Sequence, residues 1–353
     1  MRSKLLAAVG VLAAMAATTQ AENDLTKGTP DIKSVSALAF SPTGTLFVGD
    51  PTGAAVFAID TGDTNKPATS PVNIEKLDSK VAAVIGSMDK DVTFNDMKVN
   101  PATGSVYLAV TRGKTGGTPA LIRVTRAGTV EAVALKDVPF AKVSLPNPAD
   151  GKGSQMVITS MSFVDNKLVV AGLSKEDFAS TLRAIPYPFK EADKGAGIQI
   201  FHGAHGKLET NAPIRTFTTQ KVAGQDTILA AYTCTPLVKI PVSDLKAGAK
   251  VKGTTIAELG NRNNPIDMIT YTKDGKDYIL MANTARGVMK IPTGGVDSAE
   301  GITTPVKDTA GVKYETIADL KDVKQLDKLD DKRAIILVQP QGGAAELKTI
   351  DLP

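Results

Sequence analysis

The chain has 353 residues with a formal net charge of +4, and its 41 basic and 37 acidic side chains are intermixed along the sequence. A charge this small and dispersed is not typical of a nucleic-acid-binding surface, so we expect no nucleic-acid partner. Cys234 is the single cysteine, which excludes an internal disulfide and leaves stability to packing; we expect its thiol to be buried at a strand end.

The N-terminal segment predicts an export signal. Arg2 and Lys4 precede an apolar run over residues 5–17, and small residues at 19–21 offer a cleavage site. A run of about 13 residues is too short to span a bilayer about 30 Å thick. We therefore expect a signal peptide at 1–21 that is cleaved near Ala21, and a single domain over 22–353. The mature chain, without a membrane span, would be periplasmic or secreted.

A repeat begins to define the fold further along the chain. Residues 213–241 and 265–292 follow one pattern about 52 residues apart: an apolar strand, a polar turn, a second strand, a tight turn and a third strand that ends in Lys-Ile-Pro. A period near 50 residues is typical of solenoids, propellers and arrays. Units built from short strands favour a propeller, because one such sheet cannot bury both of its faces alone.

Six segments fit this pattern, with first strands that begin near residues 35, 92, 157, 213, 265 and 323. The sequence thus predicts an all-β, six-bladed β-propeller; seven blades and a β-sandwich are the alternatives. We expect fourth strands at 81–85, 129–135, 207–210, 254–259 and 314–320. The last unit ends after three strands, so we expect the mature N-terminus, near 25–33, to supply the missing strand and close the ring.

Two stretches are longer than a blade needs, residues 136–156 and 174–196. We predict a short helical insertion over 175–184, with Ser174 as its N-cap. Long loops in a compact domain usually carry function, and in a propeller these two would emerge on one rim. We therefore expect a partner-binding rim, with a lid over the channel as the alternative. Its candidate contact residues are aromatic or basic: Phe140, Phe178, Tyr187, Phe189, Arg112 and Arg286.

The same rim would receive the starts of the first strands and the ends of the second strands, which are polar. The run Asn95-Asp96-Met97 is echoed by Asp267-Met268 after Asn264. Converging Asp and Asn oxygens suit a hard divalent cation, above all Ca²⁺, although the same residues also cap turns. The candidate metal ligands are Asn95, Asp96, Asn264, Asp267 and Asn283.

On these motifs the chain resembles the exported six-bladed propellers of the NHL, gluconolactonase (senescence-marker-protein), paraoxonase and strictosidine-synthase-like group, at the level of architecture. The resemblance implies calcium at the mouth of the axial channel. The glutamate that those lactonases place near their first blade has no counterpart, because Ser36 and Ala37 occupy that neighbourhood. The catalytic histidine of the paraoxonase-like enzymes is also without a match.

Two further sets of residues have alternative interpretations. His202 and His205 have the spacing of a transition-metal pair, but no third ligand is near in sequence, and we expect an ordinary turn between strands. Methionines that recur in or near first strands could bind copper(I), but we expect them to pack in the core. They are Met97, Met161, Met268, Met281 and Met289.

Two functions follow from these predictions. The first is an exported propeller that binds another exported protein, a peptide or a small ligand through the rim and the channel. The second is a calcium-dependent lactonase or esterase, in which the cation polarises the substrate carbonyl. In that case Asn95, Asp267 and Asn283 would be ligands, and Asp96 or Asp50 the base. No nucleophile or phosphate-loop motif favours another enzyme class.

Overall fold

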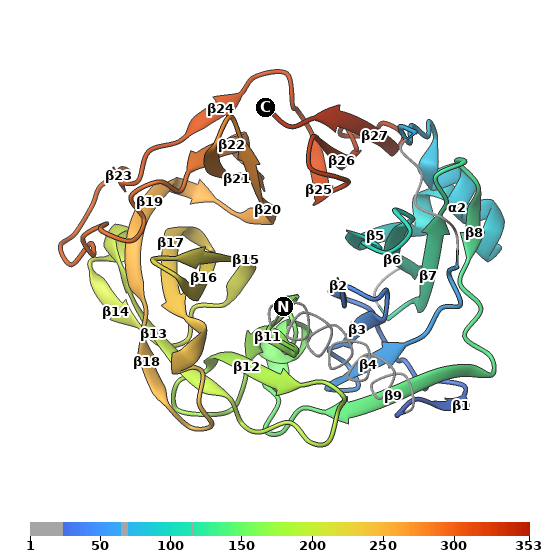
Figure 1. The fold of residues 1–353 in the computed structure, drawn as a ribbon, viewed down its shortest axis with the longest axis horizontal. Helices are drawn as coiled ribbons and strands as arrows, with labels where there is room; N and C mark the ends of the chain where they lie inside the picture. The colour runs from blue at the N-terminus through green and yellow to red at the C-terminus, as the bar shows by residue number, and fades with distance from the viewer. Residues whose placement is uncertain (1–23, 65–69, 114–115) are drawn as a thin grey trace, which may run out of the picture.

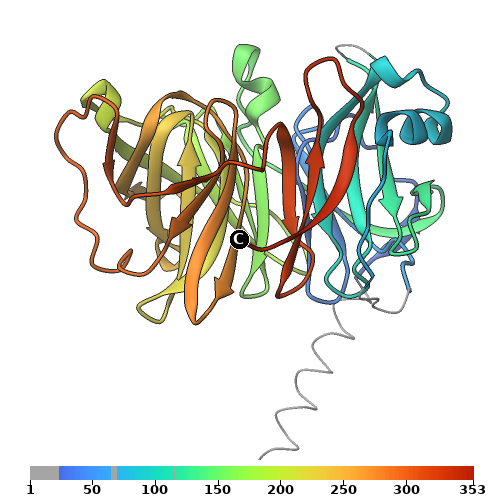
Figure 2. The same cartoon turned by 90° about the horizontal axis from the view of Figure 1, so that it is seen from above.

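In the computed structural model, which describes residues 24–64, 70–113 and 116–353, six β-sheets stand around a central axis as the blades of a propeller (Figure 1). Figure 2 shows the strands of the blades running along this axis. The six-bladed prediction is confirmed, and the predicted first strands begin within a few residues of the observed ones. The predicted signal peptide at 1–21 lies outside the described residues. No helix in the described ranges is long and apolar enough to cross a membrane.

Blades 1 to 3 use the N-terminal half of the chain. Blade 1 contains β2 (Leu38–Phe40), β3 (Leu46–Asp50), β4 (Ala55–Ile59), β9 (Val138–Ser144) and β1 (Thr26–Gly28). Blade 2 contains β5 (Val92–Val99), β6 (Val106–Arg112), β7 (Thr118–Val124) and β8 (Val130–Ala132). Blade 3 contains β10 (Ser160–Val164), β11 (Lys167–Leu173), β12 (Ser180–Pro186) and β13 (Ala196–His202), with β14 (Lys207–Glu209) and β18 (Lys250–Lys252) paired to β13.

Blades 4 to 6 use the C-terminal half. Blade 4 contains β15 (Ile214–Val222), β16 (Gln225–Tyr232), β17 (Cys234–Pro241), β19 (Thr254–Asn263) and β23 (Thr309–Gly311). Blade 5 contains β20 (Pro265–Lys273), β21 (Lys276–Asn283), β22 (Gly287–Pro292) and β24 (Glu315–Ile317). Blade 6 contains β25 (Val323–Lys328), β26 (Arg333–Val338) and β27 (Glu346–Asp351). Short 3₁₀ turns are η1 (Asp89–Asp91), η2 (Gly151–Met156), η3 (Gly203–His205) and η4 (Val242–Asp244).

Two-residue turns set the register of the innermost hairpins. Val164 pairs with Lys167 across Asp165 and Asn166, whose φ angles of 48° and 53° are both positive. Lys273 pairs with Lys276 in the same way across an Asp-Gly turn. Asp, Asn and Gly tolerate this left-handed backbone, which matches the twist of the paired strands. Asp165 and Asn166 therefore form the tight turn that joins β10 to β11.

The core lies between neighbouring blades, because each sheet buries both faces. Strand β16 shows this: Ile228, Leu229 and Ala230 are consecutive and fully buried. Their side chains alternate between the cluster shared with blade 3 and the cluster shared with blade 5. The five methionines that we expected to pack in the core are all buried.

The blades do not follow the chain around the ring. Innermost strand β5 of blade 2 lies between β25 and β2, and β2 lies against β10, so the order around the axis is 1, 3, 4, 5, 6, 2 (Figure 1). The chain leaves blade 1 after β4, builds blade 2, and returns as β9 to complete blade 1. Part of the expected 136–156 loop, Val138–Ser144, is thus a blade strand, which corrects that prediction.

Ring closure by the N-terminus is also wrong. Strand β1 pairs with β9 at the outer edge of blade 1. The outer edge of blade 6 is covered instead by the segment 72–77: the Ile74 amide donates to the Leu347 carbonyl (2.8 Å), the Leu347 amide donates back (2.9 Å), and the Leu77 amide donates to Ala345 (2.7 Å). The chain on its way to blade 2 therefore closes the ring.

The single α-helix of the described ranges is α2 (Leu77–Ile85), which contains the expected strand 81–85. Its buried residues Leu77, Val81 and Ala82 have helical spacing, and Gly86 ends it with a φ of 65°. The helix predicted at 175–184 is wrong, because Ser180–Pro186 forms β12 and pairs with β11 along its whole length. Pairing with a central strand outweighs weak local helix propensity.

Candidate functional site

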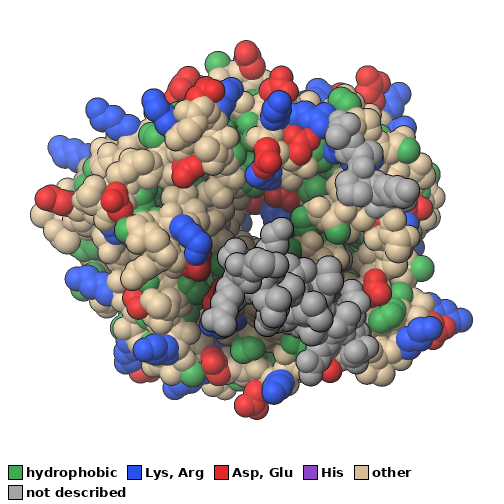
Figure 3. Space-filling model, in the orientation of Figure 1, with side chains coloured by type: hydrophobic (Ala, Val, Ile, Leu, Met, Phe, Trp, Pro, Cys, Tyr) green, Lys and Arg blue, Asp and Glu red, His purple; other side chains and the backbone are tan. Residues whose placement is uncertain are grey.

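An axial cavity of about 680 Å³ lies at the centre of the ring, where Figure 3 shows the surface hollowed. Its lining includes residues of all six innermost strands, among them Phe40, Lys98, Ser162, Thr218, Thr270 and Asp327. It also includes residues of the turns after β5 and β25, so it extends toward the face that carries the turns between first and second strands. Of the candidate site residues near the starts of first strands, Asp267 lines the cavity, whereas Asn95, Asn264 and Asn283 do not.

A bulge near the start of the first strand positions the charged side chains of this site. In β5 the register shifts between Phe94 and Asp96, and in β20 it shifts between Pro265 and Asp267. Each bulge bends the strand and re-aims the aspartate that follows it. Asp96 and Asp267 thereby take equivalent positions in blades 2 and 5, as the sequence echo indicated.

The aspartates satisfy backbone amides that innermost strands leave without a ladder partner. Asp96 accepts hydrogen bonds from the amides of Leu38 in blade 1 (2.6 Å) and its own neighbour Met97 (2.8 Å). Asp327 of blade 6 accepts from Val99 in blade 2 (2.7 Å). Each carboxylate thus joins two adjacent blades at the axis.

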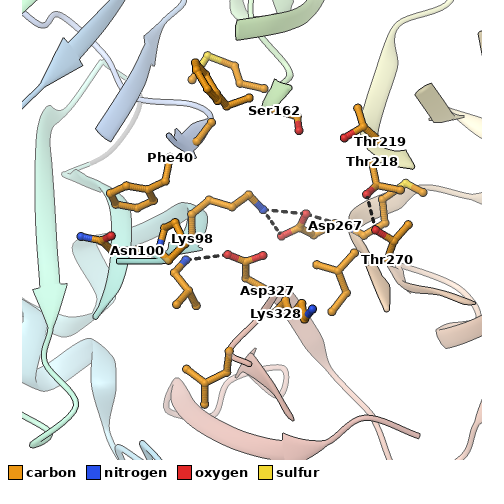
Figure 4. A pocket seen from close by; sticks show the side chains of 18 of the residues that line it. Phe40, Lys98, Asn100, Ser162, Thr218, Thr219, Asp267, Thr270, Asp327 and Lys328 are labelled. Carbon is orange, nitrogen blue, oxygen red and sulfur yellow. Dashed lines mark hydrogen bonds and ion pairs between the residues drawn. The ribbon is translucent and has the colours of Figure 1, made fainter. Parts of the chain in front are cut away.

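Lys98 is the centre of the charge cluster. Its Nζ donates to both carboxylate oxygens of Asp267, at 3.1 and 3.0 Å (Figure 4). The same Nζ lies 3.6 Å from a carboxylate oxygen of Asp96. The side chains of Lys98, Asp96 and Asp267 are 18%, 14% and 6% exposed. One ammonium therefore sits between carboxylates supplied by blades 2 and 5, and joins blades that are not adjacent in the ring.

The cluster holds more carboxylates than cations, and this shifts its ionisation. Burial raises the pKa of Asp96 to about 7, against the lowering influence of Lys98. Burial also raises the pKa of Asp327 to about 6. Burial lowers the pKa of Lys98, but the surrounding aspartates outweigh it, and the net shift is upward. The lysine stays charged, while Asp96 and Asp327 take up protons as the pH falls through about 7 and about 6.

The candidate metal ligands do not form one donor set. Asp96 and Asp267 meet at Lys98, but the Asn95 side chain donates to Thr111, and Asn283 Oδ1 accepts from Asn263 (2.9 Å). Asn264 is exposed. The oxygens of Asp267 already accept from an ammonium, so these residues do not fit the calcium site that the resemblance implies.

The expected rim residues lie apart. Tyr187 and Phe189 pack on Phe47 at ring-centroid distances of 5.0 and 5.8 Å, in the core between blades 1 and 3. Phe178 precedes β12 whereas Tyr187 follows it, which places these two rings at opposite ends of one strand.

Each of the remaining rim candidates contacts a different neighbour. Phe140 is on β9 against Phe57, Arg112 donates to the Ile85 carbonyl, and Arg286 pairs with Asp308. The structure does not join them to the blade 3 aromatics. The expectation of a partner surface stays a prediction.

The sequence patterns did not identify Lys98 and Asp327 as candidate site residues. The signal that could have found them is positional: Lys98 lies two residues after Asp96, and Asp327 two residues after Gln325, which follows the register shift of β25. When the first strands are aligned on their bulges, Lys98 and Asp327 occupy the same position, and both line the axial cavity. The sequence alone does not show where a strand bulges.

The fold and this site define a class, the six-bladed β-propellers with a charged axial cavity. No protein-family model and no curated protein matches the chain. In solved structures it is similar to a protein named as a putative glucose dehydrogenase of Thermus thermophilus, with 12% identity over 92% of this chain and 99% of that one, and a TM-score of 0.33. A PQQ-bound aldose sugar dehydrogenase of Streptomyces coelicolor matches with 12% identity over 93% and 96% of the two chains, at a TM-score of 0.30.

A streptogramin B lyase matches with 10% identity over 93% and 97% of the two chains, at a TM-score of 0.32. Likeness at these identities concerns the propeller fold and carries no argument about activity.

Proposed function

We propose that this protein is an exported propeller that binds a small hydroxylated molecule in its axial cavity. The observation that carries the proposal is the lining: all six innermost strands contribute to a cavity of about 680 Å³, a size typical of small-molecule sites. The export signal expected at 1–21 supports the location.

The polar groups of the cavity suit hydroxyl groups. The hydroxyls of Thr218 and Thr270 approach each other at 3.5 Å from adjacent blades, and Ser162 of blade 3 lines the cavity next to the blade that carries Thr218 (Figure 4). Hydroxyls both donate and accept, while the Asp267 and Asp327 carboxylates accept. Phe40 adds an apolar wall for the C–H face of a ligand. Because acidic side chains outnumber basic ones in the lining, an anionic ligand is disfavoured.

A binding screen tests this proposal. Neutral polyols and monosaccharides, primary amines and carboxylates are titrated against the protein, and binding is read by calorimetry and thermal shift. Neutral hydroxylated compounds should stabilise the fold saturably, as native-state ligands do. Thr270→Val should weaken binding by about tenfold, the loss of one hydrogen bond of about 1.4 kcal/mol.

Thr272→Val is the matched control, since Thr272 is exposed on the same strand β20 and does not line the cavity. Exclusive binding of carboxylates would contradict the proposal. So would binding that Thr270→Val and Thr272→Val affect equally. Kinship with the NHL and gluconolactonase group, and the calcium-dependent hydrolase, stay predictions without support from the cavity geometry.

A further inference from the structure

The two histidines and the single cysteine of the whole sequence meet at one place. One ring nitrogen of His202, one ring nitrogen of His205 and the thiol sulfur of Cys234 all lie within 4.8 Å of one another. The two imidazole rings face each other with centroids 3.8 Å apart. The strongest transition-metal ligands of this chain are thus gathered from two blades.

The fold holds these residues together through the contact of blades 3 and 4. His202 ends β13, His205 ends the turn η3, and Cys234 begins β17 with a φ of 77°, an unusual backbone for a residue other than glycine. The Gly203 amide in this turn donates to the buried carboxylate of Glu258 on β19 (2.5 Å). The histidine turn is therefore fixed to the blade that carries the cysteine.

A carboxylate orients both imidazoles. Glu209 on β14 lies 2.9 Å from His202 Nδ1 and 2.7 Å from His205 Nδ1, one oxygen to each ring. A carboxylate at Nδ1 holds the proton there and leaves the lone pair on Nε2, an arrangement common behind metal-bound histidines.

The donor set selects a class of ion. Two imidazoles and a thiolate suit Zn²⁺ and other late first-row ions, whereas Ca²⁺ and Mg²⁺ require oxygen donors. The His202 side chain is 2% exposed and that of His205 is 46% exposed, so one side of the cluster faces solvent. Three protein ligands with an open fourth position are typical of reactive rather than structural zinc sites.

We propose that His202, His205 and Cys234 form a three-ligand site for a late first-row transition-metal ion, with Zn²⁺ as the expected occupant and Glu209 as the positioning carboxylate. Zinc bonds of about 2.0–2.3 Å require donor atoms roughly 3.5 Å apart. His205 and Gly206, which are exposed at the end of this turn, can supply this contraction, whereas Gly203 stays fixed to Glu258. None of the four residues lines the axial cavity, so the site is independent of the proposed ligand binding.

Zinc titration of the reduced full chain against a chromophoric chelator tests the site. Wild type should bind one ion per chain. His205→Gln and Cys234→Ser should each weaken binding at least 100-fold, and Glu209→Gln by about 10–100-fold, the usual effect of losing an orienting partner. Lys252→Gln, exposed on strand β18 that pairs with β13, is the control and should bind as wild type. Circular dichroism verifies that each variant is folded.

Cobalt substitution adds a second readout that does not depend on affinity. A Co²⁺ complex of wild type should show a thiolate charge-transfer band that Cys234→Ser lacks. Absence of zinc binding by the reduced protein would overturn the proposal, as would equal binding by wild type, His205→Gln and Cys234→Ser. Rapid alkylation of Cys234 without zinc binding would identify an imidazole–thiol pair instead, which also refutes the metal site.

Discussion

At the scale of single residues, the axial cluster makes stability depend on pH. The pKa of Asp96 is raised in the folded protein to about 7 from an ordinary value of 3.8, so the folded state holds more protons than the unfolded state between these values. The contribution of the Asp96 carboxyl group to the free energy of unfolding is fully present below pH 3.8 and is lost as the pH rises toward 7. Asp327, with its pKa raised to about 6, acts in the same direction.

We therefore expect the free energy of unfolding to fall between about pH 4.5 and 7, and Asp96→Asn to flatten this slope. Urea denaturation at several pH values measures it. Asp274→Asn, at an exposed hairpin turn, should keep the wild-type slope. Parallel pH curves for wild type and Asp96→Asn would contradict the assignment.

Lys98 supports a second prediction. Lys98→Met leaves the carboxylates of Asp96, Asp267 and Asp327 without their shared cation, so we expect a loss of about 3–5 kcal/mol at pH 7.5, as for a broken buried ion pair. The loss should shrink at pH 5, where the carboxyl groups take up protons. Adding Asp267→Asn should recover part of the stability in a double-mutant cycle. A loss of equal size at both pH values would argue against a charged cluster.

The site was only partly predictable at this scale. The sequence echo of Asp96 and Asp267 identified residues that do meet at the axis, since both follow a bulge in an equivalent strand. It did not reveal that Lys98 occupies the place expected for a cation. The His202, His205 and Cys234 cluster was missed because the cysteine belongs to the next blade.

At the scale of elements, one glycine lies where two segments of the chain approach too closely for a side chain. A Cβ on Gly172 of β11 would lie 1.9 Å from the carbonyl oxygen of Val157. Gly172→Ala must therefore displace the segment leading into β10, and we expect a loss of about 1–3 kcal/mol by chemical denaturation. Gly294→Ala is the matched control, because no atom lies within 4 Å of its Cβ position. Equal stabilities of the two variants would contradict this close packing.

Hairpins were the most predictable elements, because turn residues and strand periodicity specify them locally. Fourth strands were less predictable. Strands β8 and β24 fall in their expected ranges, and β19 covers the expected 254–259 but continues to Asn263. The expected strand 207–210 is the short β14, and β13 is the fourth strand of blade 3. Outer strands face solvent on one edge, so their sequence pattern is weaker. The run Val81–Ile85 reads as a strand in isolation, although Leu77 and Val81 reveal a helical face.

At the scale of the whole molecule, the ring is closed by a segment inside the chain. Ile74→Pro removes the amide that donates to Leu347, and we expect a loss of about 3 kcal/mol with faster hydrogen exchange in β27. Removing residues 1–28, which include the outermost strand β1, should lower the free energy of unfolding by less, because Thr26 and Lys27 of this strand are exposed. If the truncation lowers the free energy of unfolding more than Ile74→Pro does, the N-terminus and not the segment 72–77 is the element that closes the ring.

The number of blades was predictable because each unit repeats local signals, whereas their order was not. Which units become neighbours depends on the path of the chain after β4 and on the return of β9, and neither has a sequence pattern that names its partner. Blade 2 therefore stands between blades 6 and 1 without any sign of it in the repeat.

The return of β9 to blade 1 has a consequence for the nascent chain. A polypeptide that has emerged only to Ile59 exposes the bare edge of β4, and that edge is covered only after Val138–Ser144 has left the ribosome. Uncovered edges invite pairing with foreign strands. Blades 1 and 2 must therefore complete their folding together. A gene fragment that ends between them would encode a blade 1 without β9.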